Sequence, residues 1–243
     1  MTGDLFDERP VRRVQRHPRA DVDPDRWPYT VPAVAQLLRD GMDLAPGVTF
    51  LVGENGAGKS TVVEAVAAAV GLNAEGGSRN ARHATRASES PLHRALQVVR
   101  SPGAPRWGYF LRAETMHGLY TYLESTGDPA PPLHEMSHGE SFLEVLGRHF
   151  AEPGFYVLDE PEAALSFTSC LALVDTLGAL RSAGAQVLCA THSPLLTALP
   201  GATILELDEH GFGPTAWEDL AIVGHWRSYL SDPRRYLRHL GAG

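Results

Sequence analysis

A glycine-rich segment carries the only lysine of the chain. Residues 53–60 read Gly-Glu-Asn-Gly-Ala-Gly-Lys-Ser, and the other basic residues among the 21 Lys and Arg are all arginines. This spacing is the G-x-x-x-x-G-K-[ST] pattern of a phosphate-binding loop. Its glycines allow successive backbone N–H groups to point at phosphate oxygens, and Lys59 adds a compact ammonium that can reach between two phosphates. The expected ligand is therefore a nucleoside triphosphate, with the Ser60 hydroxyl on a Mg²⁺ ion.

A strand and a helix must position this loop. Residues 48–52 (Val-Thr-Phe-Leu-Val) predict a buried strand, and residues 61–70 predict a helix that ends before Gly71. The loop would then lie at a helix N-terminus, whose dipole favours an anion. The residues expected to bind the nucleotide are Gly53, Glu54, Asn55, Gly56, Ala57, Gly58, Lys59, Ser60 and Thr61.

Two carboxylates end another apolar strand further along the chain. Residues 155–158 (Phe-Tyr-Val-Leu) lead directly into Asp159 and Glu160. P-loop NTPases hold Mg²⁺ with an acid at such a strand end, so Asp159 is the expected metal ligand, directly or through water. Side chains alternate along a strand, so Glu160 points elsewhere and is placed to orient and polarise an attacking water.

A histidine follows the next predicted strand. Residues 186–190 lead into Thr191-His192-Ser193, and a polar side chain at the carboxyl end of such a strand faces the ligand crevice of the sheet. In isolation, a surface or capping role would suit His192 better. The order of the motifs is what favours a catalytic role, in which His192 senses or stabilises the γ-phosphate.

This order resembles that of the ATP-binding-cassette (ABC) ATPase family, over about residues 27–210. The family's signature position holds Ser137-His138-Gly139-Glu140 here, 22 residues before Asp159; the commonest family form is Ser-Gly-Gly-Gln, so Ser137 and Gly139 match. The resemblance implies that these two residues meet the γ-phosphate bound by a second protomer. It therefore implies a head-to-tail homodimer with two ATP molecules at the interface. A plain N-cap role for Ser137 is compatible with this.

The family's glutamine loop is absent. Its position holds Arg112-Ala113-Glu114, and in this the chain is most similar to small stand-alone predicted ATPases of the ABC type. Glu114 would replace the glutamine near the metal, as an acceptor only. Only 22 residues separate Glu114 from Ser137, too few for the helical lobe of transporter ATPases or for the coiled coil of repair and chromosome-structuring relatives. We therefore expect a reduced helical lobe.

The remaining pattern predicts an α/β fold. Further strands are expected near residues 11–14, 27–31, 95–100, 107–113 and 203–207, and helices over 32–38, 114–125, 139–150, 166–182 and from 217 onward. Strands that alternate with helices predict a P-loop NTPase with a mainly parallel sheet flanked by helices. Residues 73–91 lack any periodicity and predict a long loop.

Length and composition indicate one ATP-binding domain over residues 1–243. We expect a polar N-terminal arm (1–26), a small helical lobe (114–150) and a helical C-terminal tail (217–243). No stretch approaches a membrane span and no signal peptide is apparent, so a cytoplasmic protein is expected. Cys170 and Cys189 are expected to be buried, reduced thiols.

Several alternatives stay open. The arginine-rich segment 79–94 would suit a nucleic-acid-linked clamp in repair or defence, although a net charge of −8 does not favour DNA binding. A slowly hydrolysing switch that recruits a partner protein is a third hypothesis, and a P-loop kinase is a weaker fourth. Trp27 or Tyr29 would stack on adenine, although both suit a role in the core better.

Overall fold

A mainly parallel sheet organises the protein. The computed structural model describes residues 9–73, 77–78, 90–113, 138–150 and 152–238. Among these residues, the strand order is β10 (Gly211–Pro214), β9 (Thr203–Asp208), β3 (Val48–Gly53), β8 (Gln186–Thr191), β7 (Phe155–Asp159), β6 (Gly108–Arg112) and β4 (Gly77–Ser78). The five strands from β9 to β6 run parallel, and the edge strands β10 and β4 are antiparallel to their neighbours. The predicted mainly parallel sheet is confirmed.

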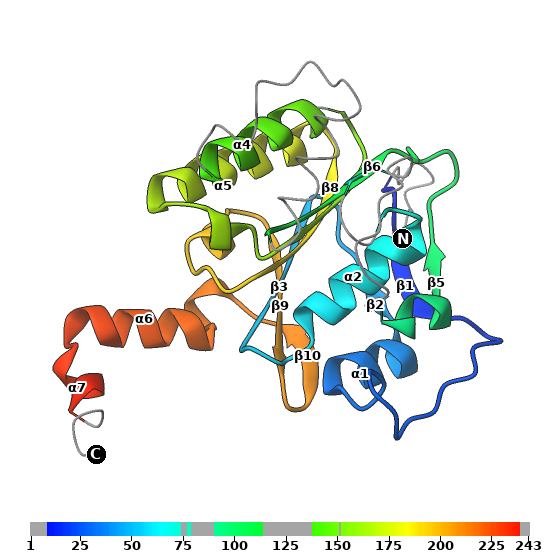
Figure 1. Ribbon diagram of the computed structural model, residues 1–243, viewed down its shortest axis with the longest axis horizontal. Helices are drawn as coiled ribbons and strands as arrows, with labels where there is room; N and C mark the ends of the chain where they lie inside the picture. Colours follow the sequence, from blue (N-terminus) through cyan, green and yellow to red (C-terminus); the bar gives the residue numbers. More distant parts are fainter. Residues whose placement is uncertain (1–8, 74–76, 79–89, 114–137, 151, 239–243) are drawn as a thin grey trace, which may run out of the picture.

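Helices cover both faces of this sheet (Figure 1). They are α1 (Pro32–Asp40), α2 (Lys59–Val70), α4 (His138–His149) and α5 (Phe167–Ser182). Phe50 on β3 belongs to the core that includes α4 and α5, whereas the next residue, Leu51, belongs to the core that includes α1 and α2. Because successive strand residues face opposite sides, apolar runs such as Val48–Val52 are buried on both.

A small antiparallel sheet packs beside α1 and α2. It consists of β2 (Met42–Asp43), β1 (Arg13–Arg16) and β5 (Leu96–Val99), in that order. Strands were predicted near residues 11–14 and 95–100, but their pairing with each other was not. Short 3₁₀ helices connect other elements: η1 (Pro91–Ala95), η4 (Pro161–Ala164) and η5 (Leu196–Ala198).

The strand predicted over residues 27–31 is wrong. This segment is a series of turns, in which Tyr29 N–H donates to the Arg26 carbonyl at 2.8 Å and Val31 N–H to the Pro28 carbonyl at 3.1 Å. Pro28 lacks an N–H group and cannot complete a strand ladder, which explains the difference. The following helix does begin at Pro32, as predicted.

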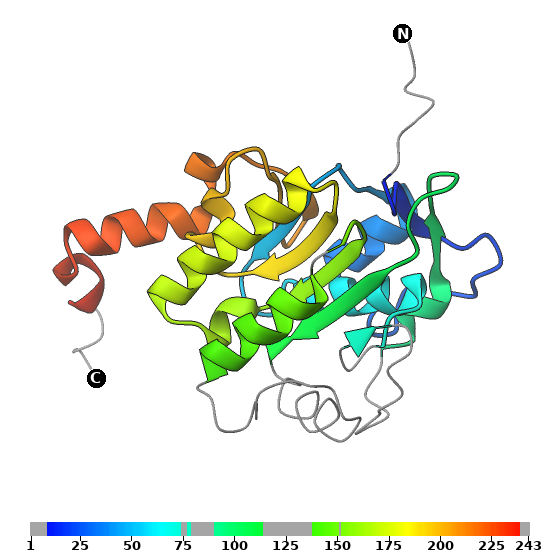
Figure 2. The ribbon, with the colours of Figure 1, turned by 90° about the horizontal axis from the view of Figure 1, so that it is seen from above.

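The C-terminal tail projects from the body (Figure 2). It contains η6 (Trp217–Asp219), α6 (Ala221–Ser231) and α7 (Arg234–Leu237), with the expected break at residues 232–233. The predicted strand over 203–207 is present as β9, but the hairpin strand β10 that follows it was not predicted.

Cys170 and Cys189 are buried free thiols, as predicted, and burial raises the pKa of both. No helix in the described ranges is long and apolar enough to cross a bilayer. The predicted helix over 114–125, most of the predicted loop 73–91, and the candidate residues Glu114 and Ser137 lie outside the described residues.

Candidate functional site

Two glycines of the segment 53–60 are required by close packing. Gly58 precedes α2 with φ +95°, and a Cβ there would lie 2.6 Å from Val31 Cγ1. A Cβ on Gly53 would lie 2.5 Å from the Leu207 carbonyl oxygen on β9. Any larger residue at these positions would push the segment away from its neighbours, so sterics fix this tight turn between β3 and α2.

Lys59 is held inside the turn. Its side chain is 3% exposed, and Nζ donates hydrogen bonds to the carbonyl oxygens of Gly53 at 2.9 Å and Glu54 at 3.0 Å. Burial lowers the pKa of the Lys59 ammonium, while the nearby carboxylates of Glu160 and Asp159 act in the opposite direction. The ammonium is thus held within the loop, next to the backbone groups that would bind an anion.

A buried carboxylate ends the neighbouring strand β7. Asp159 is 3% exposed, and its Oδ2 lies 3.3 Å from Nε of Arg112, its register partner on β6. Arg112 Nη1 also pairs with Glu64 of α2 at 3.2 Å. The guanidinium therefore links α2, β6 and β7. Sequence reasoning missed this role of Arg112, because the pairing depends on the sheet register.

Ser60 and Asp159 suit a magnesium ion chemically. Ser60 lies in the first turn of α2, which packs against β7. Both side chains offer oxygen donors, and Mg²⁺ in nucleotide sites usually takes one or two protein oxygens, with phosphates and waters completing the octahedron. No cluster of three or more His, Cys, Asp or Glu suited to a metal occurs among the described residues.

Glu160 and His192 lie together at the carboxyl ends of β7 and β8. His192 Nε2 is 2.9 Å from Glu160 Oε1, and the side chains are 30% and 35% exposed. Glu160 has φ +49°, a left-handed conformation that costs a non-glycine residue about 1–3 kcal/mol. Its N–H donates to the Ala190 carbonyl of β8 at 2.9 Å, which holds this backbone in place. Such strain is typical of functional positions.

Glu162 supports the histidine segment, a role that the sequence did not reveal. Its Oε1 accepts hydrogen bonds from the Thr191 hydroxyl at 2.7 Å and from the backbone N–H of His192. The carboxylate belongs to η4, two residues after Glu160, and thus ties the η4 turn to the end of β8. Glu162 is about thirty positions before its two partners in the sequence, and no local pattern of residue types indicates the contact.

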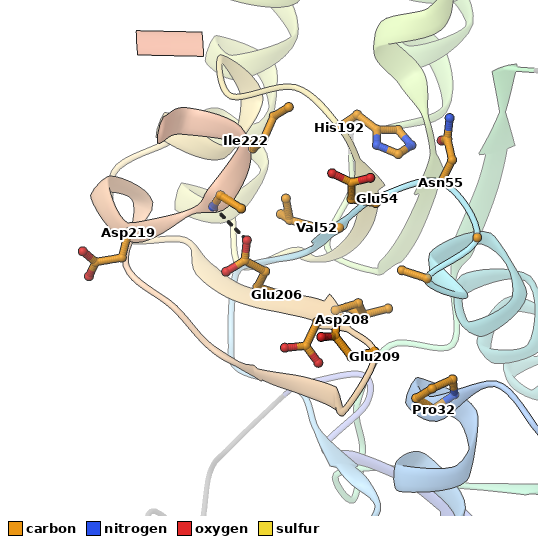
Figure 3. A pocket seen from close by; sticks show the side chains of 15 residues that line it. Pro32, Val52, Glu54, Asn55, His192, Glu206, Asp208, Glu209, Asp219 and Ile222 are labelled. Atoms are coloured by element: carbon orange, nitrogen blue, oxygen red, sulfur yellow. Dashed lines mark hydrogen bonds between the residues drawn. The ribbon is translucent and has the colours of Figure 1, made fainter. Parts of the chain in front are cut away.

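A cavity of about 870 Å³ opens beside the phosphate-binding segment (Figure 3). Residues 53–57 and His192 line one side, and the end of β9 and the start of α6 line the other. Five carboxylates contribute to the lining: Glu54, Glu206, Asp208, Glu209 and Asp219. In Figure 3, Glu54 and Asn55 lie near His192, whereas Asp219 points away from the cavity. The volume is in the range of small-molecule sites.

Three other candidate residues, Gly139, Trp27 and Tyr29, do not line this cavity. Gly139 is half-buried in the first turn of α4. Trp27 is 57% exposed and Tyr29 packs against the core near α1, and neither lines the cavity. Stacking of either ring on adenine stays a prediction.

Comparison with known proteins agrees with this geometry. A family model described as "AAA domain" matches residues 39–96. A second model, described as "AAA domain, putative AbiEii toxin, Type IV TA system", matches residues 81–198. The cytochrome c biogenesis ATP-binding export protein CcmA of Paramagnetospirillum magneticum is 31% identical over 188 residues, which cover 68% of this chain and 83% of that protein. The ribose import ATP-binding protein RbsA of Roseobacter denitrificans is also 31% identical over 188 residues, but the chain spans only 37% of its length.

The fold has solved counterparts. A metal-chelate type ABC transporter in an inward-facing conformation superposes with a TM-score of 0.51 at 15% sequence identity, over 91% of this chain and 89% of that chain. This similarity concerns the fold alone, whereas the CcmA match covers most of an ATP-binding protein. The chain therefore belongs to the ATP-binding-cassette (ABC) family of P-loop ATPases.

Proposed function

We propose that this protein hydrolyses ATP in the cytoplasm, with Mg²⁺, as an ATP-dependent dimer. Lys59 and the amides of residues 53–61 bind the β- and γ-phosphates. Ser60 and Asp159 hold the metal, which would supply charge neutralisation on the phosphates. Glu160 orients the attacking water and His192 contacts the γ-phosphate.

The pairing of Glu160 with His192 carries this proposal. A carboxylate and an imidazole at 2.9 Å lie at the strand ends beside the buried Lys59. The pair can place one proton acceptor and one hydrogen-bond donor at the same phosphate. Because phosphoryl transfer depends mainly on positioning and charge stabilisation, this arrangement fits hydrolysis better than binding alone.

Dimerisation follows from the resemblance of residues 137–140 to the family's signature. Gly139 lies at the start of α4, and we propose that Ser137 and Gly139 complete the nucleotide site of a second copy. Parental ATPase activity should then rise faster than linearly with protein concentration, at low concentration.

Ser137→Arg is expected to abolish turnover and the association that MgATP induces, while each copy of the variant still binds ATP. The bulky side chain would occupy the place of the γ-phosphate at the interface. Light scattering with MgATP and a phosphate-release assay measure both effects. Ser182→Arg, which adds the same side chain at an exposed position at the end of α5, is the control and should behave as the parent.

A mixture of Ser137→Arg with Lys59→Ala provides a sharper test. Their heterodimer has one site with both defects and one site with neither, so activity absent from each variant alone should return if one intact site suffices. Normal MgATP-induced association and normal hydrolysis by Ser137→Arg would exclude the signature assignment and leave a generic P-loop ATPase.

Glu162→Ala is expected to lower kcat on the order of 10-fold or more with little change in KM, because misplacement of His192 affects positioning more than binding. Glu162→Gln should restore most of the rate, since its amide oxygen can accept the same two hydrogen bonds. Amide hydrogen exchange at His192 should quicken in Glu162→Ala alone. Equal rates for Glu162→Ala and the parent would show that the Glu162 contacts are not needed for catalysis.

A further inference from the structure

The apolar stripe of α6 continues beyond the body of the protein. At the inner end of the helix, Val223 is 2% exposed and Ile222 packs against the core. Further along the same helix, Trp226, Tyr229 and Leu230 are 47%, 38% and 70% exposed. At the angular spacing of an α-helix, these five side chains form a stripe about 120° wide. The body thus covers one end of the stripe and leaves the other in solvent.

A helix of this kind needs a packing surface. α6 has 11 residues, and isolated helices below about 12–15 residues are marginal in water. Val223 is the only residue of α6 that is buried, and α7 has none. The exposed stripe continues into α7, where Tyr236 and Leu237 are 36% and 49% exposed. Tertiary packing of the amphipathic face normally stabilises such a helix, so a second surface is expected to cover it.

Charge is polarised along the tail. At its base, Glu218 and Asp219 are exposed, and Glu206 accepts a hydrogen bond from the Ala221 N–H at 3.0 Å. At its tip, Arg234, Arg235 and Arg238 are all exposed. Residues 221–238 contain four arginines and one aspartate, in a chain of net charge −8. The tail is therefore acidic at one end, apolar along the middle and basic at the other end.

We propose that the tail, residues 217–238, packs antiparallel against the same tail of a second copy of this chain. A twofold axis makes such an interface self-complementary. It places the arginines at each tip beside the carboxylates at the other base, and the Trp226 and Leu230 side chains against each other in the middle. A nucleic acid fits less well, because the acidic base and the carboxylates of the neighbouring cavity would repel its phosphates. This pairing needs no nucleotide and is distinct from the proposed ATP-dependent dimer.

The test uses the full chain without nucleotide, in sedimentation-velocity experiments at micromolar concentrations. The parent should be a dimer, and Trp226→Ser/Leu230→Ser should raise the dissociation constant on the order of 100-fold, or about 2.7 kcal/mol, because a few anchors at the centre of an interface carry most of its binding free energy. The control is Phe167→Ser/Leu171→Ser, which also removes two exposed apolar side chains four residues apart, on α5. The control should dimerise as the parent does. All four positions are solvent-exposed, so neither variant should impair folding.

A charge exchange identifies the partner surface. Arg234→Glu/Arg235→Glu and Glu218→Arg/Asp219→Arg should each be monomeric, because both tip-to-base contacts of their homodimers are repulsive. In a mixture of the two, the heterodimer has one native and one reversed contact, both attractive, so association should return. A monomeric parent, or a dimer that Trp226→Ser/Leu230→Ser does not weaken, would overturn the proposal. Binding of a fluorescent DNA duplex that is lost in the Arg234/Arg235 variant, without any dimer, would assign the tail to nucleic acid instead.

Discussion

Lys59→Met is expected to weaken ATP binding on the order of 100-fold. The substitution keeps the length of the side chain but removes the ammonium, which lies against the Gly53 and Glu54 carbonyls in a residue that is 3% exposed. Hydrogen bonds to charged groups contribute about 1.5–3 kcal/mol each, and a change of about 2.7 kcal/mol corresponds to 100-fold in affinity. Isothermal titration calorimetry with MgATP measures this effect directly.

Arg39→Met is the matched control. It also removes one positive charge, but Arg39 is an exposed residue of α1 that pairs with Asp40. ATP affinity should be unchanged in this variant. The parent and Arg39→Met should gain thermal stability with excess MgATP, whereas Lys59→Met should gain little, because ligand stabilisation depends on occupancy. Tight MgATP binding by Lys59→Met would rule out the phosphate-binding role of Lys59.

Local patterns predicted the central elements of the sheet well. The apolar run Val48–Val52 is buried on both faces, and Gly58 lies in the left-handed region before α2, so the strand, turn and helix follow from the order of residue types alone. The strands before Asp159 and His192 were predicted for the same reason. Strand, turn and helix propensities act over a few residues, and therefore a sequence pattern reveals them.

Contacts between distant segments were not predictable in the same way. The pairing of β1 with β5 joins residues about eighty positions apart. The hydrogen bond from the His192 N–H to Glu162 joins the segments that follow β8 and β7. The position of Arg112 beside Asp159 depends on the register of β6 and β7. Register depends on how the apolar patterns of two strands match when both are buried, so the pattern of one segment alone does not give it.

Glu160→Gln is expected to lower the ATPase rate on the order of 10²–10⁴-fold while ATP binding persists. The amide keeps the size and hydrogen-bonding shape of the side chain, and it leaves Asp159 and Ser60 in place for the metal. It removes the negative charge that polarises the attacking water. It also weakens the hydrogen bond between His192 Nε2 and residue 160, which is 2.9 Å long in the parent. Bound ATP should therefore persist, and the increase in mass that MgATP causes in light scattering should last longer than in the parent.

Glu209→Gln separates this effect from a general loss of charge near the site. Glu209 is an exposed carboxylate that lines the same cavity, and it belongs to none of the proposed catalytic contacts. Its amide variant should hydrolyse ATP at the parental rate. Single-turnover measurements distinguish slow chemistry from slow product release, since only slow chemistry delays the first turnover. If Glu160→Gln hydrolyses ATP as fast as the parent, the group that activates water lies elsewhere, and Glu114 becomes the next residue to replace, because its position in Arg112-Ala113-Glu114 follows the strand beside Asp159.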